Sequence, residues 1–192
     1  MKETGLMFKA PLVRAILSGQ KTQTRRIAKD VKHPDWGNLY TPSVLAREPQ
    51  HTIDAACPYG GPGDRIYVRE TWAYGIHAMG AMRDEDGPFV FAADGTTEGR
   101  LSDQWLPSIH MPKHAARIWL EITGVRVERL QSITEADAKA EGAVLKNSPA
   151  AHLTSYRRGF QELWESTGGD WPANPWVWVI DFKTISTTAH PA

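Results

Sequence analysis

The chain has 192 residues, of which 41% are hydrophobic and 23% charged, and its formal net charge is zero. This size and composition suit one globular domain with a real core, and a neutral chain is not expected to coat long nucleic acid by charge alone. Cys57 is the single cysteine, so no intrachain disulfide forms, and the interrupted apolar stretch at the N-terminus predicts no signal peptide and no membrane contact, which together indicate a cytoplasmic protein.

The first predicted elements are a short helix and an extended segment. Residues 11–18 are expected to be helical, because Pro11 suits the first helical position and Gly19 the position just past the end. Residues 20–26 follow as a polar, extended segment. From Lys9 to Lys32 the chain has seven basic residues and one acid, a net charge of +6. This charge fits either a solvated basic face or a local site for an anion or nucleotide.

Proline-rich and glycine-rich stretches flank one predicted strand. Residues 33–63 contain five prolines and are expected to form loops. Hydrophobic alternation over residues 65–72 predicts a strand. The glycine-rich residues 75–105 are interpreted as an excursion from the fold and a candidate lid, with a short strand at 89–92.

The C-terminal half alternates strands and helices without a regular repeat. Residues 117–130 predict a strand with a bulge at Gly124, and residues 134–141 a helix capped by Thr134 with Asp137 as its partner. An amphipathic helix at 152–166, an apolar strand at 176–182 and a frayed tail at 184–192 complete the chain. Without βαβ alternation, the order favours an α+β domain over residues 1–183 with a largely antiparallel sheet or small barrel.

Two places carry candidate chemistry. In the extended segment, Thr24 and Arg26 share a face, and the long side chain of Lys21 can be brought round to them by the turn at Gly19. A lysine can act as a base, a threonine hydroxyl as a nucleophile, and an arginine can bind a carbonyl or phosphate. Glu141 lies in the last turn of its helix, where a carboxylate opposes the helix dipole and is therefore a candidate for meeting a cation or a substrate proton.

Residues 19–26, Gly-Gln-Lys-Thr-Gln-Thr-Arg-Arg, resemble the signature of the ASCH family, glycine-x-lysine-x-x-(glutamate or threonine)-x-arginine. The Gly-Asp turn and strand at 63–72 and the order of the later elements resemble that family too, so the resemblance covers most of the chain and extends to longer ASCH-type proteins of bacteriophages and prophages. It implies a PUA-like fold, a small, mostly antiparallel β-barrel flanked by helices. Residues 28–62 and 74–112 are long loop insertions relative to the compact members.

Small bacterial members of this family are N4-acetylcytidine amidohydrolases, which use a lysine and a threonine of the signature and a glutamate of the later helix. The resemblance therefore implies Lys21, Thr24 and Glu141 as catalytic residues, an N4-acylated cytosine nucleoside as substrate and no cofactor. Either Lys21 is the base and Glu141 orients substrate or water, or Glu141 is the base and Lys21 stabilises the oxyanion. Other members are linked to RNA, so an RNA- or nucleotide-binding module or a ribonuclease is the alternative function.

Further candidates for substrate binding, beside Arg26, are Tyr67, Glu70, Trp72 and His110. Tyr67 and Trp72 are weighed as platforms for a base against core residues, and Glu70 as a hydrogen-bond partner of a pyrimidine against a partner of an arginine. His110 and His114 have the spacing of a metal pair, but Pro112 lies between them and no cysteine or acid completes a set nearby. No metal site is therefore predicted.

Overall fold

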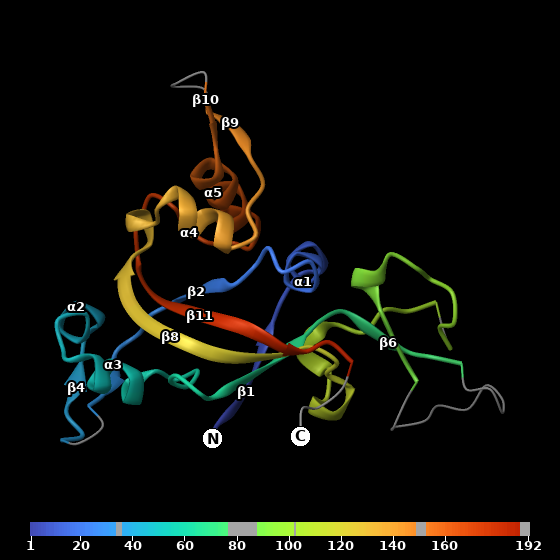
Figure 1. Cartoon of the computed structure of the whole chain (residues 1–192), viewed down its shortest axis with the longest axis horizontal. Helices are drawn as coiled ribbons and strands as arrows, with labels where there is room; N and C mark the ends of the chain where they lie inside the picture. The colour runs from blue at the N-terminus through green and yellow to red at the C-terminus, as the bar shows by residue number, and fades with distance from the viewer. Residues whose placement is uncertain (34–35, 77–87, 102, 149–152, 189–192) are drawn as a thin grey trace.

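The computed structural model describes residues 1–33, 36–76, 88–101, 103–148 and 153–188, and its centre is a curved five-stranded sheet (Figure 1). In spatial order the strands are β1 (Glu3–Met7), β5 (Arg65–Arg69), β8 (Trp119–Arg129), β11 (Trp176–Ser186) and β2 (Gln23–Ile27). β1 pairs with β5 in parallel and the other neighbours are antiparallel. The chain is therefore α+β with a mostly antiparallel sheet, as predicted. The sheet does not close into a complete barrel, because β1 and β2 remain its two edges.

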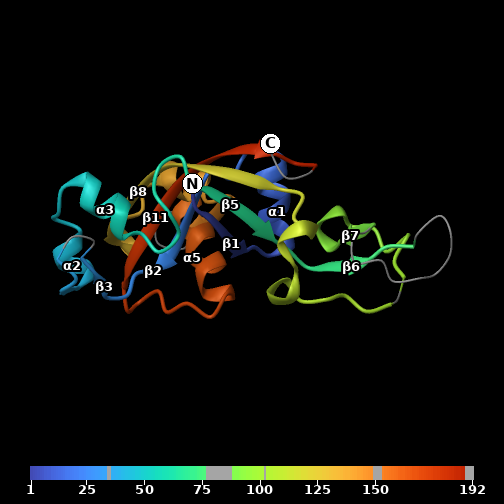
Figure 2. The same ribbon diagram turned by 90° about the horizontal axis from the view of Figure 1, so that it is seen from below.

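Helices and short hairpins surround this sheet. In the described residues the α-helices are α1 (Ala10–Leu17), α2 (Pro42–Leu45), α3 (Gln50–Ala56), α4 (Glu135–Ala140) and α5 (Tyr156–Ser166). The hairpins are β3 (Val31–Lys32) with β4 (Leu39–Tyr40), β6 (Trp72–Tyr74) with β7 (Phe89–Phe91), and β9 (Lys146–Ser148) with β10 (Leu153–Ser155). Seen from below, α2 and α3 lie at one end of the molecule and the β6–β7 hairpin at the other (Figure 2).

The strand β11 is buried on both of its faces. Val177 and Val179 belong to the apolar cluster beneath α4 and α5, whereas Trp178 and Ile180 belong to the main core on the other side of the sheet. Successive side chains of a strand point to opposite faces, so two covered faces require an unbroken apolar run. This explains why the sequence of β11 lacks the polar alternation of a surface strand.

Elements that carry local signals form where the sequence predicts them. Helix α1 has Pro11 in its first turn, and Gly19 follows it with φ +74°. Helix α4 begins with the expected capping box, in which the Thr134 side chain accepts from the Asp137 N–H and the Asp137 side chain from that of Thr134. The β8–β11 ladder shifts register next to Gly124, which confirms the predicted bulge.

The prediction of loops over residues 33–63 is wrong. This stretch contains β4, α2 and α3, and two of its prolines mark helix starts instead of loops. Pro42 is the first residue of α2, and Pro49 immediately precedes α3. The N–H groups in the first turn of a helix have no partner within the helix, so a proline, which has no N–H, costs no hydrogen bond there. Its fixed φ also suits that position.

Two boundaries near the C-terminus also differ from prediction. Helix α5 begins at Tyr156 instead of residue 152, because the Ser155 side chain accepts a hydrogen bond from the Arg158 N–H, 3.2 Å away, and caps the helix there. Residues 184–186, predicted as frayed, continue β11, with Ser186 opposite Trp119. Residue 152 and residues 77–87, at the centre of the candidate lid, lie outside the described residues. Within the part of the chain that is described, no helix has both the length and the apolar character to cross a bilayer.

Candidate functional site

The ammonium group of Lys21 meets the carboxylate of Glu141 at the C-terminal end of α4. Nζ lies 2.7 Å from Glu141 Oε2, and only 1% of Lys21 and 3% of Glu141 is exposed. Nζ also donates to the main-chain oxygens of Gln23 at 2.7 Å and Glu141 at 2.8 Å. These three acceptors match the three N–H bonds of an ammonium, so every donor of a protonated Lys21 has a partner.

Burial makes that proton easier to remove. Removal from water lowers the pKa of Lys21 from its usual value of 10.5, and the Glu141 carboxylate opposes this effect. The guanidinium groups of Arg26 and Arg25 add smaller lowering contributions through charge repulsion. The amine of Lys21 therefore exchanges its proton at less cost than an exposed lysine.

The turn after α1 and the end of α4 are fastened together, which places the pair. The Thr22 N–H donates to the Ala140 oxygen at 2.8 Å, and the Lys21 N–H donates to the Ala15 oxygen at 2.9 Å. Gly142 ends α4 with φ +82°, and a Cβ there would lie 3.0 Å from the Ala15 Cβ. The left-handed conformation and this close approach both require glycine.

Arg25 is a residue of this site that the sequence interpretation missed. Its side chain is 0% exposed, Nη1 lies 3.1 Å from Glu141 Oε1, and Nη2 lies 2.7 Å from Glu128 Oε1. Both carboxylate oxygens of Glu141 are thus engaged, one by Lys21 and one by Arg25. The available signal was parity, because positions 21, 23 and 25 of an extended segment share one face.

Thr24 and Arg26 occupy the opposite face of β2. Gln23 and Arg25 face the acids of α4, so strand alternation directs Thr24 and Arg26 the other way. Thr24 is 2% exposed and lies opposite Ile180 of β11. No hydrogen bond joins the Thr24 hydroxyl to the Lys21–Glu141 pair within the described part of the chain. The structure thus brings the predicted amine and carboxylate into contact and places the predicted hydroxyl on the neighbouring face.

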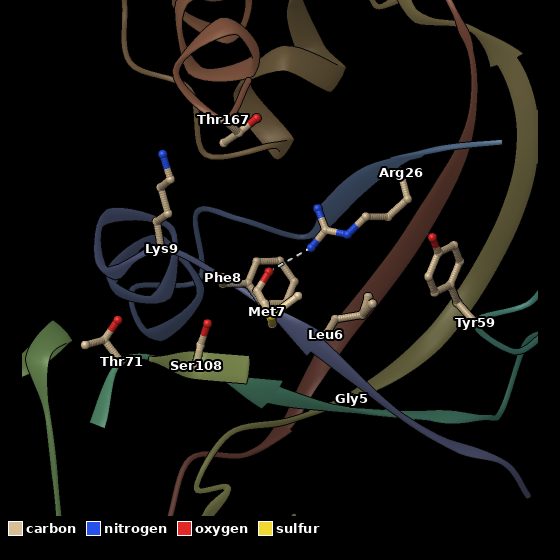
Figure 3. A pocket seen from close by; sticks show the side chains of 10 residues that line it. All are labelled: Gly5, Leu6, Met7, Phe8, Lys9, Arg26, Tyr59, Thr71, Ser108 and Thr167. Carbon is tan, nitrogen blue, oxygen red and sulfur yellow. Dashed lines mark hydrogen bonds between the residues drawn. The ribbon is translucent and has the colours of Figure 1, made fainter. Parts of the chain in front are cut away.

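A cavity of about 580 Å³ lies in the seam between the two edge strands (Figure 3). Arg26 of β2 crosses this seam, because its Nη2 donates to the Met7 oxygen at 3.0 Å. The Phe8 ring lines the cavity and contacts both cations of the site, with the Arg26 Cζ at 5.1 Å and the Lys21 Nζ at 5.8 Å from the ring centroid. Lys21 is therefore connected to this cavity, called the seam pocket below, through its contact with the Phe8 ring.

The remaining lining of the seam pocket is mixed. It consists of Gly5, Leu6, Met7, Lys9, Tyr59, Thr71, Ser108 and Thr167. A second cavity of about 370 Å³ adjoins it and shares Arg26, Tyr59 and Thr167. Burial lowers the pKa of Arg26 and raises the pKa of Tyr59, so both groups lie partly shielded from water where the two cavities meet.

Glu70 pairs with an arginine, which was one of its two predicted roles. Its two oxygens lie 3.0 Å from Arg117 Nε and 3.1 Å from Arg117 Nη2, and the same guanidinium reaches Asp94 at 2.7 Å. Burial raises the pKa of Glu70, and the hydrogen bonds from Arg117 oppose that rise.

The other predicted binding residues do not line the seam pocket. Trp72 is 2% exposed and packs against Phe89 in a separate apolar cluster. Tyr67 is half-buried against Trp119, with ring centroids 5.7 Å apart. His110 is exposed. Their chain neighbours Thr71 and Ser108 line the cavity instead. No group of three or more histidines, cysteines or acids among the described residues is placed to hold a metal ion.

Comparisons with known proteins found similar chains among solved structures alone. A scan against protein-family models and a search of curated proteins both found no match. Among solved structures, the chain is similar to a DUF984 protein from Enterococcus faecalis, with 14% sequence identity and a TM-score of 0.41 over 100% of this chain and 85% of that chain. It is also similar to an ASCH domain from Lactobacillus crispatus, with 15% identity and a TM-score of 0.39 over 96% of this chain and 80% of that chain. The chemistry of the site rests on the contacts described above.

Proposed function

We propose that the chain is an amidohydrolase that removes the acyl group from N4-acetylcytidine or a related N4-acylated cytosine nucleoside. The observation that carries this proposal is the buried contact of 2.7 Å between Lys21 and Glu141 beside the seam pocket. Removing two charges from water costs several kcal/mol for each ion. A buried acid–base pair next to a cavity, in which the pKa of the lysine is lowered, is therefore a candidate for catalysis. The resemblance to the ASCH family independently implies both residues, the lysine from the signature and the glutamate from the later helix.

In the proposed reaction, the pair acts as one acid–base unit. Its proton moves along the hydrogen bond from Nζ to Oε2, which leaves a neutral amine and a neutral carboxylic acid. In the next step the Thr24 side chain has to turn from the neighbouring face of β2 toward Nζ. Its hydroxyl then attacks the acyl carbonyl carbon and gives its proton to the amine. Arg26, on the same face of β2 as Thr24, contacts the substrate in the seam pocket that it lines.

The bond between the acyl carbon and N4 breaks as N4 takes the proton back from the Lys21 ammonium, and cytidine leaves with its amino group restored. Water then attacks the acyl ester on Thr24 and gives a proton to the same amine. The carboxylic acid departs, the proton returns to the Thr24 oxygen, and the pair is ready for another cycle. Atoms and charge balance without a cofactor, since the net change is the hydrolysis of one amide.

The test is turnover of N4-acetylcytidine by the purified chain, followed by the ultraviolet spectrum and by chromatography of the products. We expect equal amounts of acetate and cytidine. Thr24→Ala should abolish turnover, Thr24→Ser should keep part of it, and the exposed neighbour Thr22→Ala is the matched control. Folded wild-type chain that releases no acetate, or a Thr24→Ala variant as active as wild type, would contradict the proposal. Binding of RNA or nucleotide without any acetate release would support the alternative of a binding module.

A further inference from the structure

The cleft beside β2 carries positive charge that its own walls do not neutralise. Four cations line the two adjoining cavities, namely Lys9, Arg25, Arg26 and Lys29, and neither lining includes an acid. Arg25 is engaged by Glu141 and other carboxylates. Lys9, Arg26 and Lys29 form no ion pair with any residue that the structure describes. The lining is therefore complementary to an anion.

Arg26 is placed at the junction of the two cavities. A guanidinium has five N–H donors, and among the described residues Arg26 donates to two main-chain oxygens, those of Arg25 at 3.3 Å and Met7 at 3.0 Å. Burial lowers its pKa, although the charge of Glu141 acts in the opposite direction. Partly buried charges in proteins are normally paired, so the partner expected for Arg26 is an anionic ligand.

The smaller cavity lies beside the C-terminal end of α5. Besides the cations, it is lined by Thr167, Gly168 and Gly169, which follow α5. The N–H groups of these three residues donate to main-chain oxygens of Trp164 and Glu165, so the side chains of the cations carry the contact with an anion. Thr71 and Ser108 bring hydroxyl groups to the larger cavity on its other side (Figure 3). A volume of about 580 Å³ for the larger cavity is within the range of small-molecule sites.

We propose that the smaller cavity is a phosphate subsite, so that the ligand of the cleft is a phosphorylated cytosine nucleotide with its base in the seam pocket and its phosphate on Arg26 and Lys29. The choice of a cytosine base rests on the proposed function. The phosphate contact rests on the unpaired cations alone, and the two parts can therefore fail separately.

Calorimetric binding of cytidine and of cytidine 5′-monophosphate tests the subsite without requiring turnover. We expect the monophosphate to bind at least about tenfold more tightly, as charge-assisted hydrogen bonds to one phosphate would give. Arg26→Gln and Lys29→Gln should each reduce this ratio at least about threefold. Lys29 is exposed, so Lys29→Gln provides a readout even if Arg26→Gln does not fold. Lys139→Gln, an exposed lysine of α4 that lines neither cavity, is the matched control.

Equal affinity for the two ligands, or a preference for the monophosphate that survives in both variants, would overturn the subsite. A phosphate preference without hydrolysis of the acetylated nucleotide would leave the subsite standing and refute the proposed function. Hydrolysis of N4-acetylcytidine without a phosphate preference would do the reverse. Binding of a short oligoribonucleotide that ends in cytidine shows where the phosphate comes from. If the oligoribonucleotide binds more tightly than the monophosphate, the phosphate belongs to a phosphodiester strand. If it binds more weakly, the ligand is a free nucleotide.

Discussion

Glu141 and Glu70 are both buried carboxylates, but they meet their cations in different surroundings. Glu141 holds Lys21, whose side chain is 0% exposed, beside a cavity. Glu70 holds Arg117, whose side chain is 18% exposed and continues to Asp94 at the surface. A buried lysine releases its proton readily, whereas arginine stays charged in proteins. The Lys21–Glu141 contact is therefore suited to acid–base chemistry. The contacts of Arg117 with Glu70 and Asp94 are suited to joining the end of β5, the start of β8 and the segment after β7.

The largest expected effect is a loss of activity when Lys21 of the Lys21–Glu141 contact is replaced. Lys21→Met removes the amine that exchanges the proton, so kcat/KM for N4-acetylcytidine should fall by about 10³-fold. Lys139→Met removes a lysine from the exposed side of α4 and is the matched control. Turnover assays on both variants check this, and an active Lys21→Met enzyme would show that the pair serves structure only.

The next largest effect is on the free energy of unfolding, which should respond differently to the loss of Glu141 and to the loss of Glu70. Glu141→Ala leaves the fully buried Lys21 without a carboxylate, whereas Arg25 keeps Glu128, and should lower the free energy of unfolding by about 3–5 kcal/mol. Glu70→Ala should cost less, about 1–3 kcal/mol, because Asp94 still pairs with Arg117. Urea denaturation of both variants measures the difference, and equal losses would mean that the environments are equivalent.

A smaller effect concerns pH. The pKa of Glu70 is raised in the folded chain above its usual value of 4.5, so the folded state binds this proton more tightly than the unfolded state does. The free energy of unfolding of the wild type, relative to Glu70→Gln, should therefore decrease as pH rises from about 4.5 through the folded pKa. Denaturation series at several pH values test the slope, and a relative stability that increases with pH would contradict it.

The smallest effect is expected at His110. This residue is exposed and lies outside the seam-pocket lining, so His110→Ala should change KM by less than about twofold, as is usual for surface substitutions. Ser108→Ala, two residues earlier and in the lining, is the contrasting variant. A large rise in KM for His110→Ala alone would place the substrate outside the seam.

Much of the fold depends on signals that act within a few residues. Pro11 and Gly19 delimit α1, and Thr134 with Asp137 begins α4, because caps and turns depend on local hydrogen bonds and φ angles. The same kind of signal fails over residues 33–63, where the prolines predict loops. Pro42 begins a helix there, and the residues on its C-terminal side decide whether a proline starts a helix or a loop.

Local signals in the sequence predicted only part of the candidate site. The lysine, threonine and glutamate were named from the signature loop and the later helix. Their arrangement was not, because Lys21 and Arg25 contact Glu141 at the end of α4, while Thr24 and Arg26 lie on the other face of β2, where Arg26 lines the seam pocket. Strand parity indicated two faces, but only the packing of α4 against the loop showed on which face the carboxylate lies.

The sequence by itself determined the α+β class, the mostly antiparallel sheet and the amino acids available for chemistry, since periodicity and caps are written along the chain. Tertiary structure decided that the sheet stays open between β1 and β2, that a cavity fills this seam, and that Glu141 reaches Lys21 across 120 positions of sequence. These features depend on the curvature of the whole sheet and on contacts between distant segments, for which no short stretch of residues carries a signal.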